Sequence, residues 1–97
     1  MLSISETGIE ISQRFFLAIE TLKHQKRIRG LQTFTRKHGL NYGNMNTLKN
    51  HITTRSLKPE YLAFICEDYG ISCEWLLLGK GDMFIQISSK NEESQPL

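Results

Sequence analysis

The chain has 97 residues, of which 39% are hydrophobic and 23% are charged, and its formal net charge is +2. This length suits one domain with a single modest core and leaves too little chain for a second domain of useful size. No apolar run approaches the roughly 18 residues of a membrane span, and the N-terminus resembles no signal peptide, so we expect a soluble, cytoplasmic protein with reduced thiols.

The small net charge conceals a strong separation of charge along the chain. Residues 23–58 contain nine Lys or Arg and no Asp or Glu, whereas residues 1–22 and 59–97 are both net acidic. A compact fold would gather the basic stretch into one cationic face, which attracts a polyanion such as the nucleic-acid backbone. The alternative is an ordinary solvated surface, although such surfaces usually mix both signs.

The first part of the chain predicts an arm followed by two helices. Residues 1–9 are polar and aperiodic, and we expect a flexible N-terminal arm there. Apolar residues then recur with helical period from Ile11 to His24, which predicts the first helix. Basic residues 25–29 and Gly30 form the expected connection to a short second helix from Leu31 to His38.

A glycine turn leads into the third predicted helix, from Tyr42 to His51. Gly39 can adopt positive φ at low cost, and Asn41 suits the N-cap position because its side chain can accept hydrogen bonds from free backbone amides. The apolar residues on either side have the spacing of a helix-turn-helix. These residues are Phe34, Leu40, Met45 and Leu48. Two unrelated amphipathic helices joined by a glycine are the alternative interpretation.

The outer face of the third helix is polar, uncharged at its start and rich in Asn. An Asn side chain can make paired hydrogen bonds with the N6 and N7 edge of adenine in the major groove. This composition favours a base-reading face. The alternative is that the Asn side chains are simply solvated or serve as helix caps.

The last part of the chain predicts two more helices and a tail. Polar residues 53–58 form a linker, Pro59 suits the first turn of a fourth helix, and Gly70 suits its end. The apolar residues 73–78 predict a short fifth helix, and its Trp75 is expected to fill the core. Residues 10–84 would then form one domain, and residues 85–97 a short tail that is either a dimerisation strand or disordered.

The sequence contains no recognisable catalytic or metal-binding constellation. It lacks a glycine-rich phosphate loop, a nucleophile elbow and an HExxH motif. Cys66, Cys73 and His51 do not have the close spacing of zinc ligands, so Cys66 is expected to be a core residue. We therefore expect no enzymatic activity, no cofactor, no metal ion and no small-molecule ligand.

The closing part of the predicted domain resembles a known family. Residues 69–84 read YGISCEWLLLGKGDMF. This stretch is similar to the signature YG(V/I)S.EWLLTG.GEMF of the lambda-repressor-like (XRE) helix-turn-helix family, and most closely of phage CI repressor-type DNA-binding domains of bacteria and prophages. The likeness extends over about residues 15–84. The chain departs from the family at Leu31, Thr35, Leu78 and Asp82, where Gln, Ala, Thr and Glu are frequent.

The resemblance implies an all-α, five-helix domain whose third helix, at about residues 42–51, lies in the major groove of double-stranded DNA. The base-reading residues that it implies are Tyr42, Gly43, Asn44, Asn46 and Thr47. The phosphate-binding residues that it implies are Gln32, Lys49, Asn50, His51, Arg55 and Lys58. The implied function is a sequence-specific transcriptional regulator, with repression as the expected mode.

The family usually binds DNA as a symmetric pair, so the resemblance also implies a homodimer on DNA. The expected dimer surface is the apolar end of the fifth helix together with residues 83–87, where Phe84, Ile85 and Ile87 would be exposed. The alternative function is a small protein-interaction module, such as an antitoxin or an adaptor. RNA binding is less favoured because Tyr42 is the only aromatic candidate on the basic face for stacking on unpaired bases.

Overall fold

The first helix begins earlier than its apolar pattern predicts. The computed structural model describes residues 4–85, and its helix α1 spans Glu6–His24. Ser5 starts the helix because its hydroxyl accepts a hydrogen bond from the amide of Gly8 at 3.1 Å. The prediction of a flexible arm over residues 1–9 is therefore wrong for residues 6–9, while residues 1–3 lie outside the described part. The polar first turn carries no apolar period, so the pattern alone could not place it.

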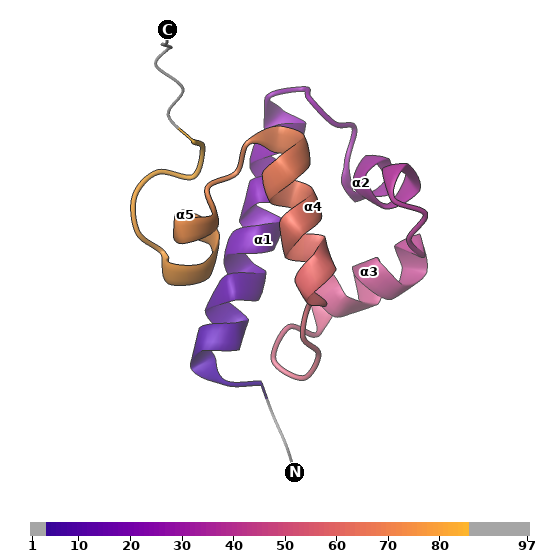
Figure 1. Cartoon of the computed structure of the whole chain (residues 1–97). Helices are drawn as coiled ribbons and strands as arrows, with labels where there is room; N and C mark the ends of the chain where they lie inside the picture. The colour runs from indigo at the N-terminus through magenta and orange to yellow at the C-terminus, as the bar shows by residue number, and fades with distance from the viewer. Residues whose placement is uncertain (1–3, 86–97) are drawn as a thin grey trace, which may run out of the picture.

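Four further helices lie between residues 31 and 78 (Figure 1). They are α2 (Leu31–Lys37), α3 (Tyr42–Asn50), α4 (Pro59–Tyr69) and α5 (Cys73–Leu78). Within residues 4–85 the only β-type pairing is an isolated antiparallel bridge between Ile71 and Phe84. The predicted all-α, five-helix class is thus confirmed for the described residues.

The helices pack around one apolar core, and each contributes at least one fully buried side chain. α5 packs against α1 and α4, and α3 packs against α2; in Figure 1, α5 lies on one side of α1, and α2 and α3 lie on the far side of α4. The ring of Phe15 meets those of Phe16 and Phe34 edge to face, with centroids 5.0 and 5.6 Å apart. The fully buried apolar side chains are Phe15, Ala18, Leu22, Phe34, Met45, Ile65, Ile71 and Leu76.

Leu76, rather than Trp75, anchors α5 in the core. Leu76 is fully buried, whereas Trp75 is only half-buried and packs against the edge of the core. Trp75 therefore packs against the core as predicted, but only in part, and Leu76 is the fully buried side chain of α5. Arg14 of α1 holds the end of this helix by donating hydrogen bonds to the carbonyl oxygens of Leu76 and Leu77.

The chain after α5 returns to the turn between α4 and α5. The Ser72 amide donates to the Met83 carbonyl and the Ile85 amide to the Gly70 carbonyl, both at 2.8 Å. Phe84 is half-buried and lies under the Arg27 guanidinium, so the expectation of an exposed Phe84 is wrong. Ile85 is 54% exposed, as expected. Residues 86–97, including Ile87 and the rest of the predicted tail, lie outside the described residues.

A polar cluster joins the end of α2 to α4. The Asp68 carboxylate lies 2.5 Å from His38 Nε2 and 3.4 Å from Lys37 Nζ. The His38 ring stacks on Phe64 with centroids 3.9 Å apart. Both His38 and Asp68 are only 15% exposed as side chains, so solvent screens their contact little.

We expect Asp68→Ala to lower the free energy of unfolding by about 1–3 kcal/mol, because His38 then keeps its largely buried position without its hydrogen-bond partner. Glu67 is the matched control, since it is the preceding carboxylate on the same helix and is exposed. Urea unfolding of Asp68→Ala and Glu67→Ala measures the difference. Equal stability of the two variants would contradict a structural role for the cluster.

Candidate nucleic-acid interface

A tight turn sets the position of α3 relative to α2. Gly39 has φ +64°, a left-handed conformation that side-chain-bearing residues rarely adopt. The Leu40 amide donates to the Thr35 carbonyl at 2.8 Å, which folds the chain back at the end of α2. Asn41 then caps α3 as predicted, because its Oδ1 accepts a hydrogen bond from the Asn44 amide at 2.8 Å. The sequence thus fixes both the end of α2 and the start of α3.

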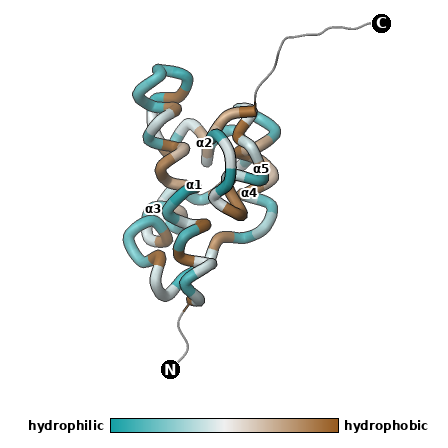
Figure 2. The backbone as a smooth tube through the Cα atoms, turned by 90° about the vertical axis from the view of Figure 1, so that its left-hand side faces the viewer, coloured by the Kyte–Doolittle hydropathy of each residue, from teal (hydrophilic) through white to brown (hydrophobic). Residues whose placement is uncertain are grey.

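Burial of Met45 and Leu48 turns the polar side of α3 toward solvent. Of the predicted base-reading residues, Tyr42, Gly43 and Asn44 are exposed, and the Tyr42 side chain is the most accessible large one at 47%. Asn46 and Thr47 are half-buried, so they present less surface to a partner. Figure 2 shows a largely hydrophilic tube at α3, with isolated hydrophobic positions.

The predicted phosphate-binding residues are all exposed, but the structure divides them between two places. Lys49, Asn50, His51, Arg55 and Lys58 lie at the end of α3 and in the loop that leads to α4. Gln32 lies apart from them in the first turn of α2. Lys49 also faces Glu20 of α1, with Nζ 3.9 Å from Oε2; both side chains are over 40% exposed, so this ion pair is weak and screened.

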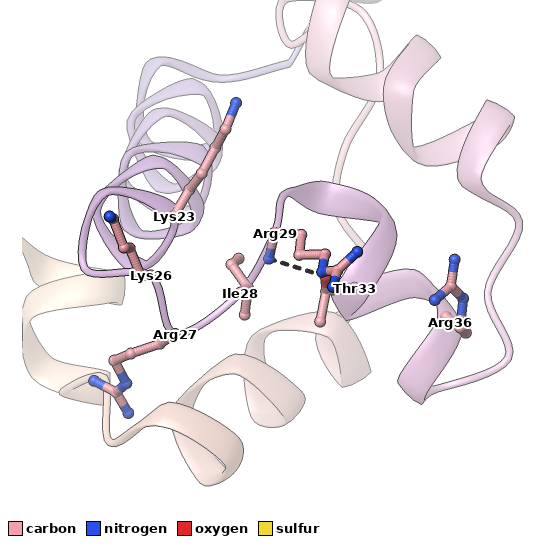
Figure 3. A pocket seen from close by; sticks show the side chains of 7 residues that line it. All are labelled: Lys23, Lys26, Arg27, Ile28, Arg29, Thr33 and Arg36. Carbon is pink, nitrogen blue, oxygen red and sulfur yellow. Dashed lines mark hydrogen bonds between the residues drawn. The ribbon is translucent and has the colours of Figure 1, made fainter.

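The structure adds a cationic groove that the sequence reasoning did not single out (Figure 3). Its volume is about 900 Å³, and it lies between the end of α1, the following loop and α2. The residues that line it are Lys23, Lys26, Arg27, Ile28, Arg29, Thr33 and Arg36. We refer to this feature as the cationic groove. Its sequence signal is the density of Lys and Arg in residues 23–29, at the start of the basic stretch 23–58, but the predicted phosphate-binding residues include none of these cations.

The groove keeps most of its positive charge available. Arg27 is engaged elsewhere, since its Nη2 donates to the Tyr69 carbonyl at 3.1 Å and its guanidinium lies over the Tyr69 and Phe84 rings. Within residues 4–85, no carboxylate forms an ion pair with the other cations that line the groove. These cations are Lys23, Lys26, Arg29 and Arg36. Five positive charges around one open groove attract a phosphate-bearing polymer.

The loop of residues 25–30 is held in place where it enters α2. The Arg29 amide donates to Thr33 Oγ1 at 3.1 Å, a contact drawn in Figure 3, and Ile28 is buried in the core beneath it. The Gln32 side chain lies beside Gly30, where a Cβ would come within 2.8 Å of Gln32 Oε1. The absence of a side chain at residue 30 therefore leaves room for the Gln32 side chain in the first turn of α2.

The described part of the chain contains neither a candidate membrane-spanning helix nor a candidate metal-binding cluster. No helix within residues 4–85 is long and apolar enough to cross a bilayer. The same residues contain no group of three or more His, Cys, Asp or Glu side chains placed to hold a metal ion.

The candidate interface therefore has three parts, which are the cationic groove, the exposed polar side of α3, and the basic loop after α3. Figure 1 shows α3 between α2, which borders the groove, and the loop that leads to α4. Such an order places cations on both sides of an uncharged helix face. Comparisons with protein-family models, with curated proteins and with solved structures find no match for this chain.

Proposed function

We propose that this protein is a sequence-specific DNA-binding transcriptional regulator in which α2 and α3 form a helix-turn-helix of the lambda-repressor-like type. The observation that carries the proposal is the placement of α3 between two groups of cations, most of which have no carboxylate partner within residues 4–85. Its exposed face holds Tyr42 and Asn44, whose side chains can donate and accept hydrogen bonds, and has no charge until Lys49. An α-helix fits the major groove of B-DNA, whose walls are the two phosphate backbones.

The proposed phosphate-binding residues and the proposed base-reading residues have different roles in recognition. Contacts to phosphates fix the register of a protein on the duplex, whereas contacts to base edges specify sequence. The cationic groove supplies the phosphate contacts before α3, and Arg55 and Lys58 supply those after it. Tyr42 and Asn46 are the direct base readers that we propose, with Asn44 and Thr47 at their edge. Gly43 contributes by allowing the α3 backbone to approach the bases closely.

Repression is the mode of regulation that we propose, because a protein that occupies its operator blocks access to the same DNA. One domain of this size covers about half of an operator, so two copies would act together. A two-fold pair places its recognition helices in successive major grooves about 34 Å apart. An apolar cavity of about 400 Å³ between α4 and α5, together with exposed Leu77 and Leu78, supports a surface for pairing away from α3.

Selection of bound duplexes from a random DNA pool tests this function. We expect enrichment of an inverted repeat whose half-sites lie roughly one helical turn apart. An enriched site without dyad symmetry would contradict the dimer. Recovery of no enriched sequence, together with a stoichiometric complex with another protein, would instead favour the protein-interaction module.

Substitution of Tyr42 distinguishes base-specific contacts from sequence-independent electrostatic attraction to the phosphates. We expect Tyr42→Ala to lose about 1–3 kcal/mol of discrimination at particular base pairs, because a lost base contact affects only the position that it reads. The control is Lys49→Ala, which we expect to weaken all sequences about equally. Repeating the selection with each variant measures both effects. An unchanged selected motif for Tyr42→Ala would place base reading elsewhere.

A further inference from the structure

The two cysteines of the chain meet at the junction of α4 and α5. Cys66 lies in the last turns of α4, and Cys73 is the first residue of α5. Gly70, with φ +71°, reverses the chain between them. Both side chains line the same apolar cavity of about 400 Å³, beside Leu62 and Leu76. The fold therefore brings two residues that are separated along the chain to one wall of a shared cavity.

The two thiols differ in exposure and in chemistry. Both are free, Cys73 being exposed and Cys66 half-buried. Burial, which is the largest cause, together with a hydrogen bond with Cys73 and the charges of Cys73 and Glu67, raises the pKa of the Cys66 thiol to about 12. Because both side chains line the same cavity and Cys73 affects the pKa of the Cys66 thiol, an electrophilic sulfur at Cys73 would form close to Cys66.

We propose that Cys66 and Cys73 form a reversible disulfide across the α4–α5 junction in reaction with a hydroperoxide. In the first step the Cys73 thiolate attacks a peroxide oxygen, the O–O bond breaks, and an alcohol or water leaves, which makes Cys73 a sulfenic acid. In the second step the Cys66 sulfur attacks the Cys73 sulfur, the S–O bond breaks, and water leaves with the Cys66 proton. Two thiols and one hydroperoxide thus give one disulfide, one alcohol or water, and one further water. A dithiol reductant reverses the bond by exchange.

The order of the two steps follows from the positions of the thiols. Cys73 reacts first because it is open to solvent, and the thiolate is the reactive form of a cysteine. Cys66 is protonated at neutral pH, since the pKa of its thiol is raised, and it therefore resists direct oxidation. It acts only on the neighbouring sulfenic acid. The bond would close one wall of the cavity and fix α5 to α4, independently of whether the protein binds DNA.

Treatment of the full chain with hydrogen peroxide, followed by intact mass measurement and thiol titration, tests the proposal. We expect the loss of both free thiols, a mass lower by two hydrogen atoms, no covalent dimer, and full recovery after dithiothreitol. Far-UV circular dichroism before and after treatment checks that the helices persist. A disulfide between two chains, a product that only gains oxygen atoms, or two unreacted thiols would each overturn the proposal.

Two single substitutions assign the roles of the cysteines. In Cys66→Ala we expect a sulfenic acid that dimedone traps on Cys73, and no loss of hydrogen. In Cys73→Ser, which changes an exposed side chain, we expect Cys66 to stay reduced under the same treatment. Sulfenic acid formed on Cys66 at the rate seen for Cys73 would contradict the proposed order. Because these readouts are masses and thiol counts, they are separate from any test of DNA binding.

Discussion

Replacing Phe34 with alanine is expected to lower the free energy of unfolding by about 3–5 kcal/mol. Phe34 is fully buried, and its ring meets Phe15 of α1 edge to face and lies 5.3 Å from the His38 ring. Removal of the ring leaves a cavity between α1 and α2 that close-packed neighbours fill only in part. Since small domains are stable by only about 5–15 kcal/mol, this loss is a large share of the total.

The effect of Phe34→Ala is expected to fall hardest on α2. This helix has seven residues, and Gly30 at its N-cap provides no side-chain hydrogen bond. A helix this short is held by packing rather than by its own propensity. Leu78→Ala is the matched control, because Leu78 is also a large apolar residue but is 63% exposed. Urea unfolding followed by circular dichroism measures both variants. A loss no greater for Phe34→Ala than for Leu78→Ala would contradict the described core.

Raising the salt concentration from 50 to 200 mM is expected to weaken DNA binding by roughly 10²–10³-fold for each bound subunit, since about five phosphate contacts per subunit each contribute about −0.9 to the slope of log affinity against log salt. The physical reason is the release of counterions from the duplex when cations of the protein replace them. Fluorescence anisotropy of a labelled duplex across a salt series measures the slope. A flat titration would contradict the proposed interface.

Single substitutions test whether the cations of the cationic groove contribute to this salt dependence. We expect Arg29→Ala or Arg36→Ala to reduce the magnitude of the slope by about one, because each removes one proposed phosphate contact. Lys80→Ala is the control, since Lys80 is exposed but lies beyond α5, away from the groove. An equal change of slope for Lys80→Ala would mean that net charge, and not the groove, governs binding.

Local chemistry made several elements predictable from the sequence. The cap at Asn41, the left-handed turn at Gly39 and the end of α4 at Gly70 depend on the residue itself and its near neighbours, and these three features were predicted correctly. The apolar period of α1 likewise predicts which face of the helix is buried. Such features need no knowledge of distant contacts.

Features that depend on tertiary packing could not be predicted in the same way. Residue type favoured Trp75 over Leu76 as the buried side chain of α5, but Leu76 is the fully buried one, and α5 is held by Arg14, which lies far away in the sequence. The cationic groove arises because the end of α1 and the start of α2 face one another across a loop, which no short motif encodes. The half-burial of Asn46 is also a result of packing, since its position on the helix predicted exposure.

A hydrogen bond joins the residues just before α1 to the loop after α3, and it affects how much conformational entropy that loop loses on binding. The Ile4 amide donates to the Thr53 carbonyl at 3.1 Å, so the start of the chain fastens the loop that carries Arg55. A loop that is already ordered loses less conformational entropy when it meets a partner, and this preorganisation leaves more of the interaction energy for affinity. Loss of this hydrogen bond would therefore weaken the complex even though Arg55 itself remains in place.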